Sequence, residues 1–247
     1  MSLVAGRLSV QAGAHHMEIH QGGNGTLLGG VPGVAPAKVL VLGGGVVGSS
    51  AIRVALGMGA DVTVLDRSVS RLGELDEQYR GQLRTVYSTA EALEMHAREA
   101  DLIIGAVLIP GAPAPKLVTA EMLANFKPGT VMVDVAIDQG GCFETSRPTT
   151  HADPTYEVDG VVHYCVANMP GAVAKTATMA LTNATLPYII RLASNEVGSL
   201  LLEDKHFGAG LNIVHGQLTH RAVAEALGQM WTEPDQILRA SLHLKSA

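Results

Sequence analysis

Short apolar runs and longer amphipathic segments follow one another in a regular order along the middle of the chain. The apolar runs predict strands at Val39–Leu42, Val62–Leu65, Leu83–Tyr87, Leu102–Val107, Val131–Val135 and Val161–Val166. The amphipathic segments predict helices at Val46–Met58, Val69–Tyr79, Thr89–Arg98 and Thr119–Phe126, the last with Thr119 as its N-cap. Continuous apolar strands are typical of parallel sheets that are covered on both faces. The alternation therefore predicts an α/β fold with a doubly wound parallel sheet.

The two flanks of this pattern differ from its middle. Before it, Val4–Ile19 predicts a helix with Val4, Leu8, Val10, Ala14 and Met17 facing inward, followed by a glycine-rich connection. After Pro170, a long helical stretch from Ala172 to Ser194 is interrupted by Pro187, and a further helix is expected at Thr219–Leu227. We therefore expect a linker helix (1–20), a central domain (21–170) and a C-terminal helical segment (171–247).

The first strand ends in three spaced glycines, Gly43, Gly45 and Gly48. This G-x-G-x-x-G spacing between a strand and a helix is the fingerprint of a Rossmann-type dinucleotide site, although a flexible glycine turn is the alternative. Asp66 ends the next strand, about 20 residues on, where the fingerprint places an acid that accepts hydrogen bonds from the ribose. The glycines and Asp66 together favour NAD as the cofactor, while Arg67 is a basic neighbour that could accommodate the extra phosphate of NADP.

Composition narrows the class of protein. The 247 residues include 47% hydrophobic residues and 28 glycines, with a net charge of −6, which is globular and gives no footprint for nucleic acid or an anionic membrane. Two cysteines, Cys142 and Cys165, fit a reducing compartment. Neither a signal-peptide pattern nor an apolar stretch of about 18 residues is present. We expect a cytoplasmic location.

Polar residues follow the carboxyl ends of two later strands, where open α/β sheets bind their ligands. Asp138 and Asn168 are therefore candidates to face the reacting end of the cofactor, although both residue types are also common in turns. Asp134 lies inside a strand and is expected to be a structural hydrogen-bonding group. Arg147 either binds a phosphate or caps its loop.

The histidines and cysteines predict no metal or thiol chemistry. His15, His16 and His20 have no third ligand or metalloprotease spacing, so a solvated helix face is favoured over a zinc site. Cys165 is expected to pack in the core, and no base is identified for Cys142.

From Gly29 to about Pro187 the sequence resembles the alanine dehydrogenases, a family that includes the alpha subunit of proton-translocating transhydrogenase. The segments that carry the resemblance are Leu28–Val34, Gly43–Gly48, Ile104–Gly111, Asp134–Glu144 and Tyr164–Gly171. It implies NAD-dependent oxidative deamination of L-alanine to pyruvate and ammonia, with Asp138 as the active-site aspartate. Together with the glycine fingerprint, it implies that the residues around the cofactor are Ser2, Gly43, Gly45, Val46, Val47, Gly48, Asp66, Arg71, Ser88, Val107, Leu108, Val135, Ala136, Ile137, Asp138, Arg147, Val166, Ala167, Asn168 and Met169.

The sequence also departs from the family pattern. Family members carry a substrate domain ahead of the first helix, and its arginine, lysine and histidine have no counterpart here. Arg191 and Asn195 occupy positions that hold metal ligands in some members, so no metal is expected. The leading hypothesis is an NAD-binding core, with a helical remnant of the substrate domain, that turns over alanine weakly or not at all alone. It is expected to form a homo-oligomer, because the helices after Ala172 would expose an apolar face.

Two alternatives stay open. The first is a non-catalytic NAD-binding or assembly module, similar to a transhydrogenase alpha subunit, that needs a separate substrate-domain partner. The second is a complete dehydrogenase that uses only Asp138 and Asn168.

Overall fold

A seven-stranded sheet forms the centre of the first of two structural units. The computed structural model describes residues 1–107 and 114–245, and the chain divides into units at Met1–Thr178 and Met179–Ala247. The strands of the sheet are β1 (Lys38–Leu42), β2 (Asp61–Asp66), β3 (Leu83–Tyr87), β4 (Leu102–Gly105), β5 (Val131–Asp134), β6 (Thr155–Val158) and β7 (Val161–Tyr164). Their order is β3-β2-β1-β4-β5-β7-β6, with six parallel strands and β6 antiparallel to β7. The predicted doubly wound sheet is confirmed.

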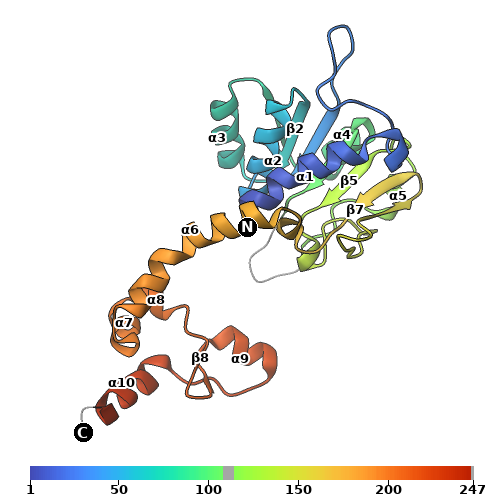
Figure 1. Cartoon of the computed structure of the whole chain (residues 1–247). Helices are drawn as coiled ribbons and strands as arrows, with labels where there is room; N and C mark the ends of the chain where they lie inside the picture. Colours follow the sequence, from blue (N-terminus) through green and yellow to red (C-terminus); the bar gives the residue numbers. More distant parts are fainter. Residues whose placement is uncertain (108–113, 246–247) are drawn as a thin grey trace. The chain divides into compact units, whose positions relative to one another are not determined.

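Helices cover both faces of this sheet (Figure 1). They are α1 (Ser2–His16), α2 (Val46–Gly57), α3 (Val69–Tyr79), α4 (Ala90–Glu99) and α5 (Ala120–Leu123). Side chains alternate along a strand, so Val39 and Val41 of β1 pack with α1, α2 and α3, whereas Leu40 and Leu42 pack with α4 and α5. The two faces explain why the strand sequences are apolar throughout.

Helix α1 lies against α2 on one face of the sheet (Figure 1). Leu8, Val10 and Met17 are buried as expected, whereas Val4 and Ala14 are half-buried. At Gly6 the helix approaches α2 so closely that a Cβ would lie 2.2 Å from the Val47 carbonyl oxygen, so this contact requires a glycine. The predicted linker helix is therefore part of the first compact unit.

Three local predictions need correction. Helix α5 has four residues instead of the eight expected, because Asn125 and Phe126 continue the segment with hydrogen bonds to the residue three positions earlier, which are not those of an α-helix. The Thr119 side chain makes no capping hydrogen bond, and the Ala120 N–H donates to the Glu144 carboxylate over 2.8 Å. The edge strand β6 was not expected, since its residues are half-buried or exposed and lack an apolar run. Pro187 does not interrupt α6 (Ala174–Ala193), because Asn183, whose carbonyl loses its partner, is exposed to water.

The second unit contains short helices and a two-stranded hairpin. Its elements are α7 (Val197–Glu203), α8 (Lys205–Gly208), β8 (Ile213–Val214), β9 (Gln217–Leu218), α9 (Arg221–Leu227) and α10 (Pro234–Lys245). Trp231 donates a hydrogen bond to the Thr219 carbonyl oxygen over 3.0 Å and ties the hairpin to the segment before α10. Helix α6 exposes Met179, Leu181, Leu186, Tyr188, Ile189 and Ile190. Among the residues that the structure describes, no helix is long and apolar enough to cross a membrane.

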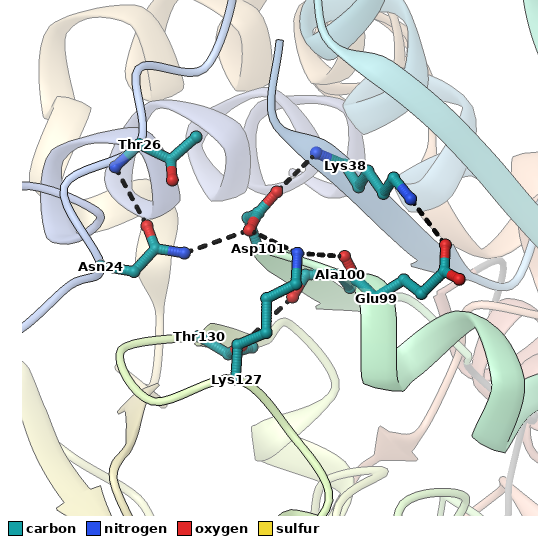
Figure 2. Close-up of polar contacts among 8 residues, drawn as sticks. All are labelled: Asn24, Thr26, Lys38, Glu99, Ala100, Asp101, Lys127 and Thr130. Carbon is teal, nitrogen blue, oxygen red and sulfur yellow. Dashed lines mark hydrogen bonds and ion pairs between the residues drawn. The ribbon is translucent and has the colours of Figure 1, made fainter. Parts of the chain in front are cut away.

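The amino-terminal ends of β1 and β4 are joined by the buried carboxylate of Asp101 (Figure 2). It accepts hydrogen bonds from the Lys38 backbone N–H over 2.8 Å, from the Asn24 side chain over 3.1 Å and from Lys127 Nζ over 2.9 Å. Lys38 Nζ also pairs with Glu99 at the surface over 2.6 Å. This network lies at the end of the sheet opposite to the one where α/β proteins bind ligands, which assigns it a structural role.

Asp101→Ala is expected to lower the free energy of unfolding by about 1–3 kcal/mol, because it leaves partly buried donors without their acceptor. Glu99→Gln is the matched control: it breaks an exposed ion pair next to Asp101 and should leave the urea midpoint unchanged. Urea unfolding curves of both variants test this, and equal midpoints for the two would contradict it.

Candidate functional site

The turn between β1 and α2 uses its three predicted glycines for different physical reasons. Gly43 has φ +96°, a backbone conformation that favours glycine. A Cβ at Gly48 would lie 1.8 Å from the Gly43 carbonyl oxygen, so only glycine permits the helix to begin so close to the strand. At Gly45, in contrast, no described heavy atom lies within 4 Å of the place of a Cβ. Gly45 thus borders open space into which a ligand can approach the backbone.

Asp66 and Arg71 hold this turn from the side. Asp66 accepts hydrogen bonds from the Gly44 N–H over 2.6 Å and from the Ser68 N–H over 2.8 Å. Arg71 donates from Nε to the Gly44 carbonyl oxygen over 2.7 Å and forms an ion pair with Glu74. Each carboxylate oxygen has a second lone pair, so Asp66 can still accept bonds from a ribose. The acid of the fingerprint therefore also shapes the glycine turn.

A cleft of about 470 Å³ opens beside the turn. Its lining residues are Ser2, Leu42, Gly43, Gly45, Val46, Val47, Leu65, Asp66, Arg67, Ser88, Ala106, Val107, Pro115 and Leu117. Eight of the predicted cofactor residues are among them, namely Ser2, Gly43, Gly45, Val46, Val47, Asp66, Ser88 and Val107. Leu42, Leu65, Ala106, Pro115 and Leu117 were missed, because nothing in their local sequence separates a lining apolar residue from a core one.

The cleft suits a dinucleotide in size and in chemistry. Its volume falls in the range of small-molecule sites, and apolar walls meet a few polar groups in it. No side chain in the described part of the chain caps α2 at Gly45, so the first N–H groups of the helix remain free for a phosphate. Asp66 and Arg67 lie side by side in the lining, at the position where Rossmann-type sites contact the ribose hydroxyls or a 2′-phosphate.

The second group of predicted residues lies in the loop after β5, which is built around the buried carboxylate of Asp134. Asp134 has no exposed surface and accepts hydrogen bonds from the Ala136 and Cys142 N–H groups over 3.1 and 2.9 Å and from Ser146 Oγ over 2.6 Å. Burial raises the pKa of Asp134, and the hydrogen bonds from Ser146 and Cys142 counteract the rise. The structural role expected of Asp134 agrees with this geometry.

The same loop is fastened along its other side to residues 114–118. The Ala114 N–H donates to the Gln139 carbonyl oxygen over 3.0 Å, and the Leu117 N–H donates to that of Cys142 over 2.7 Å. Lys116 Nζ donates to the Phe143 carbonyl oxygen over 3.0 Å. A segment that lines the nucleotide cleft is thereby connected to the loop that carries Asp138.

Asp138 and Asn168 lie beyond the carboxyl ends of β5 and β7, which are neighbours in the sheet. Both are exposed, and the Asp138 carboxylate makes no hydrogen bond or ion pair with any residue that the structure describes. Val135, Ala136 and Ile137 lead into Asp138, and Val166, Ala167 and Met169 surround Asn168. None of these residues lines the cleft beside the glycine turn, so they form a separate group at the same edge of the sheet.

Arg147 lies over the ring of Tyr156, with its guanidinium carbon 4.0 Å from the ring centroid. Its backbone N–H donates to the Tyr156 hydroxyl over 2.8 Å, and that hydroxyl donates to the Thr145 carbonyl oxygen over 2.9 Å. The edge strand β6, absent from the sequence expectations, therefore supports the loop that carries Arg147. Gly48 and Arg71 do not line the cleft, and Leu108 lies outside the described residues.

The histidine cluster is only partly as expected. His15 and His20 are exposed and lie near Glu18, whereas His16 is buried against the Tyr164 ring, so the prediction of a solvated face was wrong for His16. Helix α1 turns that position toward β7. In the part of the chain that the structure describes, no three His, Cys, Asp or Glu side chains are placed to hold a metal. Arg191 instead pairs with Asp204, and Asn195 donates to the Arg191 carbonyl oxygen.

Comparison with known proteins agrees with this architecture. The family model for the alanine dehydrogenase/PNT C-terminal domain matches residues 9–221. The chain belongs to this family. An alanine dehydrogenase of the family from Halomonas elongata is 66% identical over 238 residues, which are 96% of this chain and 64% of that protein. The chain thus spans a little less than two thirds of the length of that relative.

Solved structures show the same fold. A structure titled L-alanine dehydrogenase superposes with a TM-score of 0.90 at 52% identity, over 92% of this chain and 63% of the other. The transhydrogenase from Sinorhizobium meliloti superposes with a TM-score of 0.71 at 26% identity, over 90% of this chain and 60% of the other. Both likenesses extend well beyond the glycine fingerprint.

Asp134→Ala is expected to lower the free energy of unfolding by about 3 kcal/mol, because several buried N–H donors lose their acceptor. Asp138→Ala, in the same loop, removes an exposed carboxylate without a partner among the described residues and should leave stability unchanged. Urea unfolding of the two variants tests this. A stable Asp134→Ala protein would show that the loop does not depend on the carboxylate.

His163 makes stability depend on pH. Its buried ring donates from Nδ1 to the Val161 carbonyl oxygen over 2.9 Å and meets the Thr145 hydroxyl with Nε2 over 2.8 Å, and burial lowers its pKa. The unfolded chain then binds the proton more readily, so the free energy of unfolding should fall as pH drops below about 6.5.

Urea midpoints of the wild type between pH 5 and 8 measure this dependence. In His163→Gln the slope should be smaller, whereas His20→Gln, which changes an exposed histidine, should keep the wild-type slope. Equal slopes for the wild type and His163→Gln would contradict the assignment.

Proposed function

We propose that this polypeptide binds NAD in the cleft beside Gly45, and that the protein to which it belongs oxidatively deaminates L-alanine to pyruvate and ammonia. The observation that carries the first part is the open space at Gly45 next to the Asp66 carboxylate in one cleft. The name alanine dehydrogenase on the Halomonas elongata relative, at 66% identity, supports the second part.

Binding would divide between two parts of the site. The free N–H groups at the start of α2 would hold the pyrophosphate, and Asp66 would accept hydrogen bonds from the adenosine ribose. Ser88 and Val107 line the same cleft, and the resemblance adds Arg71, Leu108 and Arg147 to the cofactor's surroundings. The nicotinamide end would then be directed toward the loops after β5 and β7.

The chemistry of the reaction assigns roles to this chain's residues at that end. NAD supplies the hydride acceptor for the α-carbon of alanine, and a water molecule supplies the oxygen of pyruvate. The protein must orient the α-carbon and manage the released proton. The exposed Asp138 carboxylate is free to receive a proton or an ammonium group, and the Asn168 side chain can orient a neighbouring amide. Asp134 and Lys116 hold the loop in which Asp138 lies.

Two further expectations belong to the same proposal. Alanine oxidation by this 247-residue polypeptide alone should be slow or absent, because the relative named alanine dehydrogenase extends beyond the part that the chain matches. The alternative is a non-catalytic NAD-binding module with a separate substrate-domain partner, and the likeness to the transhydrogenase structure supports it. Self-association through the exposed apolar residues of α6 also stays a prediction.

Calorimetric titration with NAD and NADP tests the cofactor assignment. The wild type should prefer NAD, since the Asp66 carboxylate repels a 2′-phosphate. Asp66→Asn keeps an acceptor for the Gly44 N–H but loses the charge. It should therefore weaken NAD binding, and the ratio of NAD affinity to NADP affinity should fall by about tenfold or more. Asp61→Ala, at the other end of the same strand, is the matched control and should bind like the wild type.

The outcomes separate the alternatives. Tight NADP binding by the wild type would overturn the role of Asp66 and point to Arg67. NAD binding without NADH formation from alanine supports the expected weak turnover, and copurification with a separate substrate-domain chain would favour the assembly module. Alanine-dependent NADH formation at rates typical of enzymes, about 1–1,000 s⁻¹, would contradict the expected weak turnover.

A further inference from the structure

Asn168 has an unusual backbone conformation for its position in the site. It has φ 57° and ψ 49°, the left-handed region that non-glycine residues rarely adopt, although asparagine tolerates it better than most. It is the one candidate cofactor residue other than glycine with a positive φ in the part of the chain that the structure describes. Such conformations persist when neighbouring contacts hold them, and they concentrate at functional sites.

His151 supplies one of those contacts. Its Nε2 lies 3.2 Å from the Asn168 carbonyl oxygen, which also accepts the Gly171 N–H over 2.9 Å. A carbonyl oxygen can only accept, so Nε2 carries the hydrogen and the imidazole is the donor. The carbonyl of Asn168 is therefore held from two sides, by a side chain 17 positions earlier and by a backbone N–H three positions later.

Gly171 leaves the space that this arrangement needs. A Cβ at position 171 would lie 3.1 Å from His151 Nε2 and 3.2 Å from Asn168 Nδ2, which is tighter than ordinary van der Waals contact. Any larger residue would have to displace the imidazole or the Asn168 side chain. His151, Asn168 and Gly171 thus lie in mutual contact at the surface.

Backbone hydrogen bonds join Thr149, two residues before His151, to the residues that follow β7, and this places the imidazole near Asn168. The Thr149 N–H donates to the Cys165 carbonyl oxygen over 2.9 Å, and the Ala167 N–H donates to that of Thr149 over 3.3 Å. Thr149 Oγ1 donates to the Pro154 carbonyl oxygen over 2.9 Å and closes the turn that holds His151. The approach of His151 to Asn168 is therefore built into the fold.

We propose that His151 is a positioning residue: by holding the Asn168 carbonyl oxygen, it fixes the left-handed turn that presents the Asn168 side chain to the nicotinamide half of the bound dinucleotide. The inference rests on the proposed NAD binding. His151 does not line the cleft beside Gly45, so it acts at the nicotinamide half and leaves the adenosine and pyrophosphate contacts as they are.

The test compares NAD with ADP-ribose, which has the adenosine and pyrophosphate groups but no nicotinamide. His151→Phe keeps a planar ring and removes the donor, so it should weaken NAD binding by about three- to tenfold and leave ADP-ribose binding unchanged. His151→Gln can place an N–H near the same oxygen and should restore NAD affinity. His20→Phe, which changes an exposed histidine outside the contact of His151, Asn168 and Gly171, is the matched control.

A second variant keeps the test valid if His151→Phe does not fold. Gly171→Ala places a methyl group against the imidazole and should give the same selective loss of NAD affinity. Unchanged NAD affinity in both His151→Phe and Gly171→Ala would overturn the inference, as would an equal loss for NAD and ADP-ribose, which indicates a general structural effect. A wild type that binds neither ligand would refute the proposed NAD binding itself, and the inference with it.

Discussion

The contact between the Gly43 carbonyl oxygen and the backbone of α2 at Gly48 is the constraint on which the nucleotide cleft depends. At this distance no side chain fits, because a Cβ at Gly48 would lie 1.8 Å from that oxygen. The close approach aims the start of α2 at the carboxyl end of β1 and exposes its first N–H groups. Asp66 accepts from the Gly44 N–H and Arg71 donates to the Gly44 carbonyl oxygen, so the turn is held without a ligand.

The other half of the site depends on a different interaction, the buried carboxylate of Asp134. A charge without exposed surface is costly unless it is hydrogen-bonded, and here the donors are N–H and hydroxyl groups of the loop that it organises. Asp138 is left free at the outside of that loop. A backbone turn therefore forms the cleft beside Gly45, and a buried acid supports the proposed substrate end.

The sequence predicted the buried strands of the sheet but not the edge strand β6. The parallel strands β1, β2, β4, β5 and β7 are buried on both faces, so their runs identify them regardless of their neighbours. Strand β6 pairs only with β7 at an edge, and nothing in its own pattern requires it. His16 shows the same limit for a side chain, since the spacing of the histidines does not tell which of them faces β7.

The sequence by itself determined the doubly wound sheet, the glycine turn and the acid at Asp66. Each of these follows from a local pattern: strand-length apolar runs, glycines at fixed spacing, and a carboxylate at the end of the next strand. Only the tertiary structure decided that Lys116 fastens the loop carrying Asp138, that Tyr156 supports Arg147 and that His151 holds Asn168. These contacts join different segments through a few hydrogen bonds and one contact between a guanidinium group and a ring. The sheet order brings them together, and no periodicity in the chain records which residues will meet.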